Sequence, residues 1–125
     1  MKLDCLTIAG GDQSIVRLSE FSANEASILS GEISKLSEQR EREVKVHKLA
    51  GVSSVAGCEL IFHLSARDQG ILTAGPSRFE CRLTAGTWDN VAGLVEPLTK
   101  DVTGYQWLVG STENGGLLIS ANGDW

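Results

Sequence analysis

The alternation of apolar and polar positions is clearest in residues 78–84, where it predicts a strand with one buried side. Phe79, Cys81 and Leu83 lie on one face, and charged or polar side chains lie on the other. The residues that follow change to a spacing typical of a helix. The last part of the chain is therefore expected to form a strand, a helix and a hairpin in succession.

The helix is predicted to begin at Trp88, because Thr87 is a residue type whose hydroxyl caps helix N-termini. Asp89 would then lie in the first turn, at the positive end of the helix dipole. Pro97 lacks an amide donor, so the helix should end near Glu96, with one irregular turn after it. The apolar stripe of this helix consists of Trp88, Val91, Leu94, Val95 and Leu98.

A hairpin is predicted after the helix. Tyr105, Trp107 and Val109 are expected to share one face of its first strand, and Trp107 is expected to pack with Trp88 in the core. Asn114 and Gly115 are the strongest turn signal in the chain, because both residue types tolerate positive φ angles. Residues 117–120 then return as the partner strand.

The N-terminal part begins with two predicted strands, at residues 3–9 and 14–19, around a glycine-rich turn. Ser22 and Glu25 then have the spacing of a capping box, in which each residue accepts a hydrogen bond from the backbone amide of the other. This motif predicts a helix over residues 23–39.

Two further strands are predicted at residues 44–49 and 58–65. The inward positions of the second are Cys58, Leu60, Phe62 and Leu64. Because this rhythm matches that of residues 78–84, the two strands are predicted to be neighbours. The connection between them, residues 66–77, has two interpretations: a binding loop, or a short strand at residues 70–73 followed by a turn.

The order of these elements predicts an α+β fold: an antiparallel or mixed sheet of about six or seven strands with two helices packed on it. The chain has 125 residues, which fits a single domain over residues 1–125. No apolar run approaches the ~20 residues of a membrane span, and the first residues do not resemble a signal peptide. We therefore expect a cytoplasmic protein with no membrane partner.

Cysteine usage agrees with a reducing compartment, because the chain has three cysteines and no CxxC motif. Cys5, Cys58 and Cys81 all fall on predicted strands, where a thiol behaves as a small apolar side chain. The two histidines, His47 and His63, have no ligand at the spacing of a zinc site. No metal and no cofactor is expected.

Charge is the strongest functional signal in the composition. The net charge is −5, and from residue 83 onward five acids against one lysine account for −4 of it. A nucleic-acid interface needs the opposite charge, so DNA and RNA are disfavoured as partners. An acidic surface of this kind attracts a basic protein.

Catalytic motifs are absent from the sequence: it contains no GxSxG, HExxH, Walker loop or GxGxxG motif. This absence favours a non-enzymatic function, although the members of a catalytic triad can meet in the fold without any sequence motif.

The C-terminal part of the chain, residues 81–125, contains a set of segments that carry a resemblance: Cys81-Arg82-Leu83, Trp88, Val91, Leu94-Val95-Glu96-Pro97-Leu98, Gly104-Tyr105-Gln106-Trp107-Leu108, Leu117-Leu118-Ile119-Ser120 and Gly123-Asp124-Trp125. With these segments it resembles the C-terminal part of small acidic bacterial proteins of unknown function, of the kind that include toxin-immunity proteins and products of mobile gene cassettes. The resemblance implies no catalytic residues.

The first functional hypothesis is a non-enzymatic interaction protein, such as an immunity-type inhibitor, that binds a basic protein through an acidic surface. Its candidate residues are Asp89, Asp101, Glu113, Asp124 and Trp125. The alternative is a small-molecule binding module, monomeric or homodimeric, with a pocket between sheet and helices. The candidate pocket residues are His63, Arg78, Arg82, Ile71 and Leu72. An enzyme without a recognisable motif is the third hypothesis.

Overall fold

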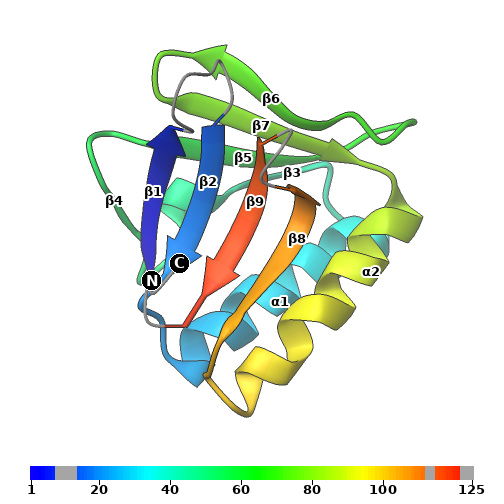
Figure 1. Ribbon diagram of the computed structural model, residues 1–125. Coiled ribbons are helices and arrows are strands. Elements are labelled where there is room, and N and C mark those ends of the chain that lie inside the picture. The colour runs from blue at the N-terminus through cyan, green and yellow to red at the C-terminus, as the bar shows by residue number, and fades with distance from the viewer. Residues whose placement is uncertain (8–13, 112–114, 122–125) are drawn as a thin grey trace.

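Figure 1 shows the computed structural model, which describes residues 1–7, 14–111 and 115–121. Two helices pack on mixed β-sheets, so the predicted α+β class is confirmed. In place of one sheet of six or seven strands, the described residues form nine strands in two sheets. The strands of one sheet cross those of the other steeply, and the two helices lie side by side against them (Figure 1).

The first sheet has the strand order β4-β1-β2-β9-β8. β1 and β8 run antiparallel to their neighbours β2 and β9, whereas β2 and β9 are parallel to each other. Its strands are β1 (Lys2–Thr7), β2 (Ser14–Ser19), β4 (Ser53–Ser54), β8 (Tyr105–Ser111) and β9 (Gly115–Ser120).

The second sheet has the order β3-β5-β7-β6. β5 and β7 are neighbours, as predicted, and they run parallel. The short strand predicted in the connection between them is also present, as β6, which pairs antiparallel with β7. The strands are β3 (Glu43–Lys45), β5 (Glu59–Leu64), β6 (Gly70–Gly75) and β7 (Arg78–Leu83).

The prediction for residues 44–49 is wrong in its second half. The chain leaves β3 at Lys45 and forms a short 3₁₀ helix, Val46–Lys48. His47 explains part of this turn, because its Nδ1 lies 3.2 Å from both the backbone nitrogen and the carbonyl oxygen of Leu60. A side chain from the turn thus occupies the place that a continuing strand would take beside β5.

The first helix, α1 (Ala23–Ser37), starts with the predicted capping box. The Glu25 amide donates to Ser22 Oγ at 3.2 Å, and the Ser22 amide donates to Glu25 Oε1 at 2.9 Å. Two free amides at the helix start are satisfied in this way. The buried stripe of α1 consists of Ala26, Leu29, Ile33 and Leu36.

The second helix, α2 (Ala85–Val95), begins one turn earlier than predicted. Its N-cap is Thr84, whose Oγ1 accepts the Thr87 amide at 3.3 Å, so the assignment of Thr87 as the cap is wrong. Asp89 consequently lies beyond the first turn, and it does not gain the expected stabilisation from the helix dipole. The predicted irregular end is confirmed, as the 3₁₀ helix Glu96–Thr99.

Trp88 joins α2 to the second sheet. The side chain is fully buried, and its ring lies 4.7 Å from that of Phe62, centroid to centroid. Its indole N–H donates to the carbonyl oxygen of His63 at 2.9 Å, so the polar atom of the ring is satisfied in the core. The inward positions predicted for β5 are correct, with Cys58, Leu60 and Phe62 buried.

The prediction of which β8 side chains face the core is wrong. A register shift between Trp107 and Val109 places Leu108 in the core, and Trp107 lies opposite Leu118 on the other face of the first sheet. Trp107 therefore does not pack with Trp88. β8 and β9 pair antiparallel as the turn signal predicts, although Asn114 lies outside the described residues.

Neither helix in the described part of the chain is long and apolar enough to cross a membrane.

Replacing Phe62 with alanine should lower the free energy of unfolding by about 3–5 kcal/mol, because the ring is fully buried against Trp88. Leu94→Ala is the control, since Leu94 is 37% exposed and should change stability by only about 0.5 kcal/mol. Urea denaturation of both variants measures the difference. Similar losses for the two would mean that Phe62 does not anchor the core.

Burial should also make Cys58 and Cys81 slow to react. It raises the pKa of Cys58 to about 11 and that of Cys81 to about 12, so only about a thousandth of the Cys58 thiols are ionised at pH 8. Iodoacetamide labelling mapped by mass spectrometry should therefore be slow at both sites in the native protein and fast in denaturant. Rapid native labelling at either site would contradict a structural role.

Candidate functional site

The acidic candidates of the C-terminal part lie along α2 and just after it. Asp89 is on the exposed side of α2, and Asp101 is exposed beyond the 3₁₀ helix. Glu113, Asp124 and Trp125 lie outside the described residues. The structure thus places two of the five predicted binding residues, on neighbouring segments.

Glu96 adds a third carboxylate that the candidate set lacked. It follows Asp89 by seven residues, which brings the two to the same side of a helix, about 10 Å apart along its axis. Gly93 lies between them, and a Cβ built on it would meet no atom within 4 Å. The i, i+7 spacing is visible in the sequence, although there Glu96 is expected only as the end of the helix. We call Asp89, Glu96 and Asp101 the α2 acidic face.

Among the described residues, these three carboxylates differ from most other acids in having no ion-pair partner. None of the ion pairs within 4 Å in this part of the chain includes Asp89, Glu96 or Asp101. Most other described acids pair: Asp4 with Arg17 (2.8 Å), Glu20 with Lys2 (3.3 Å), Glu32 with Lys35 (2.9 Å), Glu59 with Arg78 (3.6 Å) and Glu80 with Arg82 (2.6 Å). No ion pair within the described residues therefore neutralises the α2 acidic face, although the exposed Lys100 is next to Asp101 in the chain.

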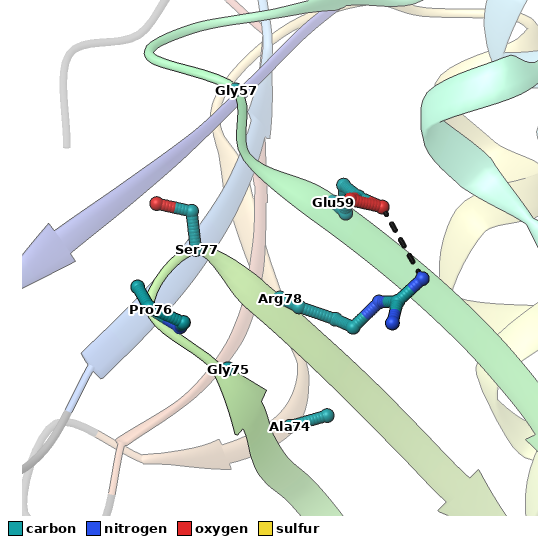
Figure 2. A pocket seen from close by; sticks show the side chains of 7 residues that line it. All are labelled: Gly57, Glu59, Ala74, Gly75, Pro76, Ser77 and Arg78. Atoms are coloured by element: carbon teal, nitrogen blue, oxygen red, sulfur yellow. Dashed lines mark ion pairs between the residues drawn. The ribbon is translucent and has the colours of Figure 1, made fainter.

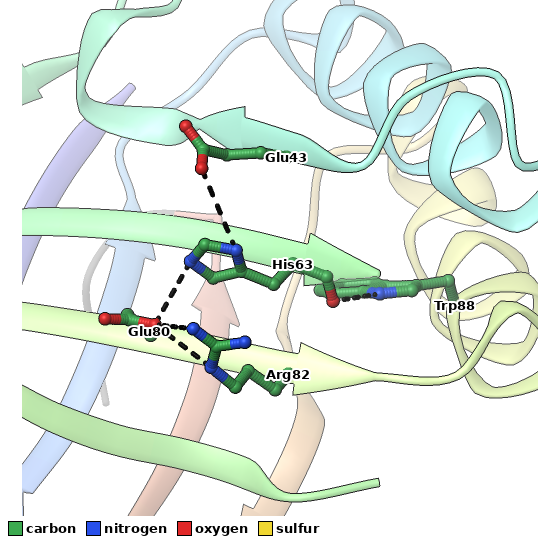
Figure 3. Close-up of polar contacts among 5 residues, drawn as sticks. All are labelled: Glu43, His63, Glu80, Arg82 and Trp88. Carbon is green, nitrogen blue, oxygen red and sulfur yellow. Dashed lines mark hydrogen bonds and ion pairs between the residues drawn. The ribbon is translucent and has the colours of Figure 1, made fainter. Parts of the chain in front are cut away.

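A second group of polar side chains lies on the outer face of the second sheet, shown in Figure 3. His63 Nε2 is 3.1 Å from Glu80 Oε1, and His63 Nδ1 is 3.9 Å from Glu43 Oε2. Arg82 donates to the same Glu80 oxygen from Nε and Nη2, at 3.0 and 2.6 Å. Strand alternation explains the grouping, because His63 faces Glu43 across β3–β5 and Arg82 across β5–β7.

This outer-face group is largely satisfied internally. Glu80 is the shared acceptor, and although His63 Nε2 is close to it, the two are not aligned as a hydrogen bond. A ligand would have to displace these contacts. Within the described ranges, no three His, Cys, Asp or Glu side chains are placed to hold a metal ion.

A cavity of about 360 Å³ lies at the other end of the same sheet, near the β6–β7 turn (Figure 2). Its charged side chains are Arg78 and Glu59, which pair at 3.6 Å. The lining residues are Gly57, Glu59, Ala74, Gly75, Pro76, Ser77 and Arg78.

The structure does not bring the five predicted pocket residues together. Arg78 lines the cavity, whereas His63 and Arg82 belong to the outer-face group. Leu72 is exposed on β6, and Ile71 packs against the hydrophobic core. Among the described residues, core side chains pack in the space between the sheets and the helices, where the pocket was expected.

Comparison of the chain with protein-family models, with curated proteins and with solved structures finds no significant match. The resemblance to immunity and gene-cassette proteins therefore stays a prediction.

Asp68 fixes the start of the helix that carries the acidic face. Its carboxylate accepts the Thr84 amide at 2.8 Å and the Thr87 hydroxyl at 2.7 Å, which ties the β5–β6 connection to the first turn of α2. The Thr84 amide and then the Thr87 hydroxyl lower the pKa of Asp68, because they stabilise the charged form.

Asp68→Asn should therefore reduce stability at neutral pH, and the difference from wild type should shrink in acid. A carboxyl whose pKa is lowered on folding stabilises the protein above its unfolded pKa, about 3.9, and this contribution is lost as the pH falls through the folded value. Urea unfolding of both proteins at pH 7 and pH 3 measures the change. A difference that is constant with pH would contradict the role of the charge.

Proposed function

We propose that this protein is a non-enzymatic interaction protein that binds a basic protein through the α2 acidic face, in the manner of an immunity-type inhibitor. The observation that carries the proposal is the contrast between the unpaired Asp89, Glu96 and Asp101 and the paired acids elsewhere. Unpaired exposed carboxylates contribute little to folding, and they remain available to a partner's lysine and arginine side chains.

The positions of Asp89 on α2 and of Glu96 at its C-terminal cap support this function. α2 is capped at Thr84 and packed through Trp88, Val91 and Val95, so its exposed side is held before any partner arrives. A partner then binds without the entropic cost of ordering a loop. Leu94, 37% exposed on the same helix, adds apolar contact area beside the charges.

The second candidate function is small-molecule binding at the cavity near the β6–β7 turn. Its volume falls within the usual range of ligand sites, and Arg78 offers a cation at its wall. Arg78 is already paired with Glu59, so its charge is less available to a ligand. Small-molecule binding is therefore the weaker of the two candidate functions.

The test is a charge reversal with a matched control. The variant Asp89→Lys/Glu96→Lys reverses the α2 acidic face, and Glu38→Lys/Glu41→Lys makes the same charge change on exposed residues after α1. A basic protein encoded beside this gene is the first partner to assay. Its association rate with the α2 variant should fall several-fold relative to wild type, while the control changes it much less, because exposed charges act over about 8–10 Å.

Raising the salt concentration should slow wild-type association and remove most of the difference between the variants. Stopped-flow measurements at low and high ionic strength provide both comparisons, and unfolding curves should be nearly unchanged for both variants. Equal effects of the two charge reversals, or a rate indifferent to salt, would rule out the α2 acidic face as the binding surface.

A further inference from the structure

The ion pair at the cavity near the β6–β7 turn differs from the other arginine–carboxylate pairs of the described chain. Arg78 Nη2 lies 3.6 Å from Glu59 Oε1, which is too far for a hydrogen bond. Arg17, Arg40 and Arg82, in contrast, donate hydrogen bonds to carboxylates at 2.6 to 3.1 Å. The side chains of Arg78 and Glu59 are 53% and 37% exposed, so their hydrogen-bonding groups are open to solvent.

Strand pairing places these two side chains on the outer face of the second sheet. Glu59 and Arg78 are direct partners in the parallel pair β5–β7, and the residues that follow them, Leu60 and Phe79, are buried in the core. Because side chains alternate along a strand, Glu59 and Arg78 point away from the core, and they approach each other across the two strands (Figure 2).

The rest of the cavity wall is uncharged and built from small residues: Gly57, Ala74, Gly75, Pro76 and Ser77. The backbone holds this wall in place. The Cys58 amide closes a turn by donating to the Val55 carbonyl at 3.1 Å, and the Glu59 amide donates to the Ser77 carbonyl at 2.8 Å. The ring of Pro76 fixes its own φ angle in the turn between β6 and β7. A volume of about 360 Å³ is near the lower end of the range of ligand sites, so the cavity suits a small molecule.

We propose that this cavity binds a small zwitterion, an α-amino acid with a small side chain, through Arg78 and Glu59. The inference rests on the second candidate function, small-molecule binding at the same cavity. The carboxylate of the ligand accepts two hydrogen bonds from the planar guanidinium of Arg78, and its ammonium group donates to Glu59. The small residues of the wall leave room for a side chain such as a methyl group.

A zwitterion fits this pair of charges better than an anion or a cation alone. An anion that binds Arg78 is repelled by Glu59, and a cation that binds Glu59 is repelled by Arg78. An α-amino acid carries both charges on one carbon, so it offers each side chain the opposite charge. The ion pair that it separates is largely exposed and contributes little to stability, whereas the new charge-assisted hydrogen bonds are ones that the pair does not make itself.

The test uses L-alanine as the probe and amide NMR chemical shifts of the full chain as the readout. Saturable shifts are expected at the cavity, at Gly57, Glu59, Gly75 and Arg78, with a Kd on the order of 1 mM. Two probes each change one group of L-alanine: L-lactate replaces the ammonium by a hydroxyl, and L-alaninamide replaces the carboxylate by a neutral amide. Each should bind several-fold more weakly than L-alanine.

Four variants locate the two charges. Arg78→Gln and Glu59→Gln should each weaken L-alanine binding several-fold. Arg67→Gln and Glu41→Gln make the same changes at exposed residues that do not line the cavity, and they should bind L-alanine as the wild type does. Unfolding curves should be nearly unchanged in all four, because exposed charges contribute little to folding. Glu59→Gln also removes the repulsion of anions, so L-lactate should bind to this variant at least as tightly as L-alanine.

Equal binding of L-alanine and L-lactate to the wild type would identify an anion site. Equal binding of L-alanine and L-alaninamide would identify a cation site. Either result overturns the zwitterion proposal and leaves small-molecule binding at the cavity standing. Shifts that fail to saturate, or that lie away from the cavity, for all three probes would overturn both. A loss of L-alanine binding in Arg67→Gln equal to that in Arg78→Gln would also overturn the proposal, because it would reflect net charge alone.

Discussion

The contact on which most of the structure depends is that of Trp88 with β5. The buried indole stacks near Phe62 and donates to the carbonyl of His63, so one side chain fixes both the height and the rotation of α2 over the second sheet. Burying an indole N–H without a hydrogen-bond acceptor would cost free energy. This contact therefore depends on the carbonyl acceptor as well as on the apolar packing. The orientation of the α2 acidic face follows from it.

The elements that could be predicted from sequence are those with local signals. Alternation in residues 58–65 and 78–84 identified the buried faces of β5 and β7, and the spacing of Ser22 and Glu25 identified the start of α1. Pro97 correctly indicated an irregular end to α2. Each of these signals acts within a few residues, and at these positions the tertiary contacts agree with it.

The features that could not be predicted depend on partners far away in the sequence. Thr84 caps α2, and its own amide donates to Asp68 in the connection between β5 and β6. The bulge at Leu108 is defined only by the pairing of β8 with β9. The division into two sheets rests on which strands meet in space. The same holds for the candidate site: the sequence shows Glu96 as an acid, but only the fold shows that no described residue forms an ion pair with it.

The placement of the α2 acids is not explained by the stability of the helix. Asp89 lies beyond the first turn, and Glu96 lies at the C-terminal end, where the dipole disfavours a negative charge by about 0.3–1 kcal/mol. The last turn carries no basic residue to offset it. Elsewhere in the described chain, most acids are placed where the fold itself uses them. Glu25 and Asp68 accept hydrogen bonds at the starts of the two helices, and Asp4 and Glu80 pair with arginines. Carboxylates that the fold does not use remain available to groups outside the molecule, which is why α2 rather than the outer face of the second sheet is the surface proposed for a basic partner.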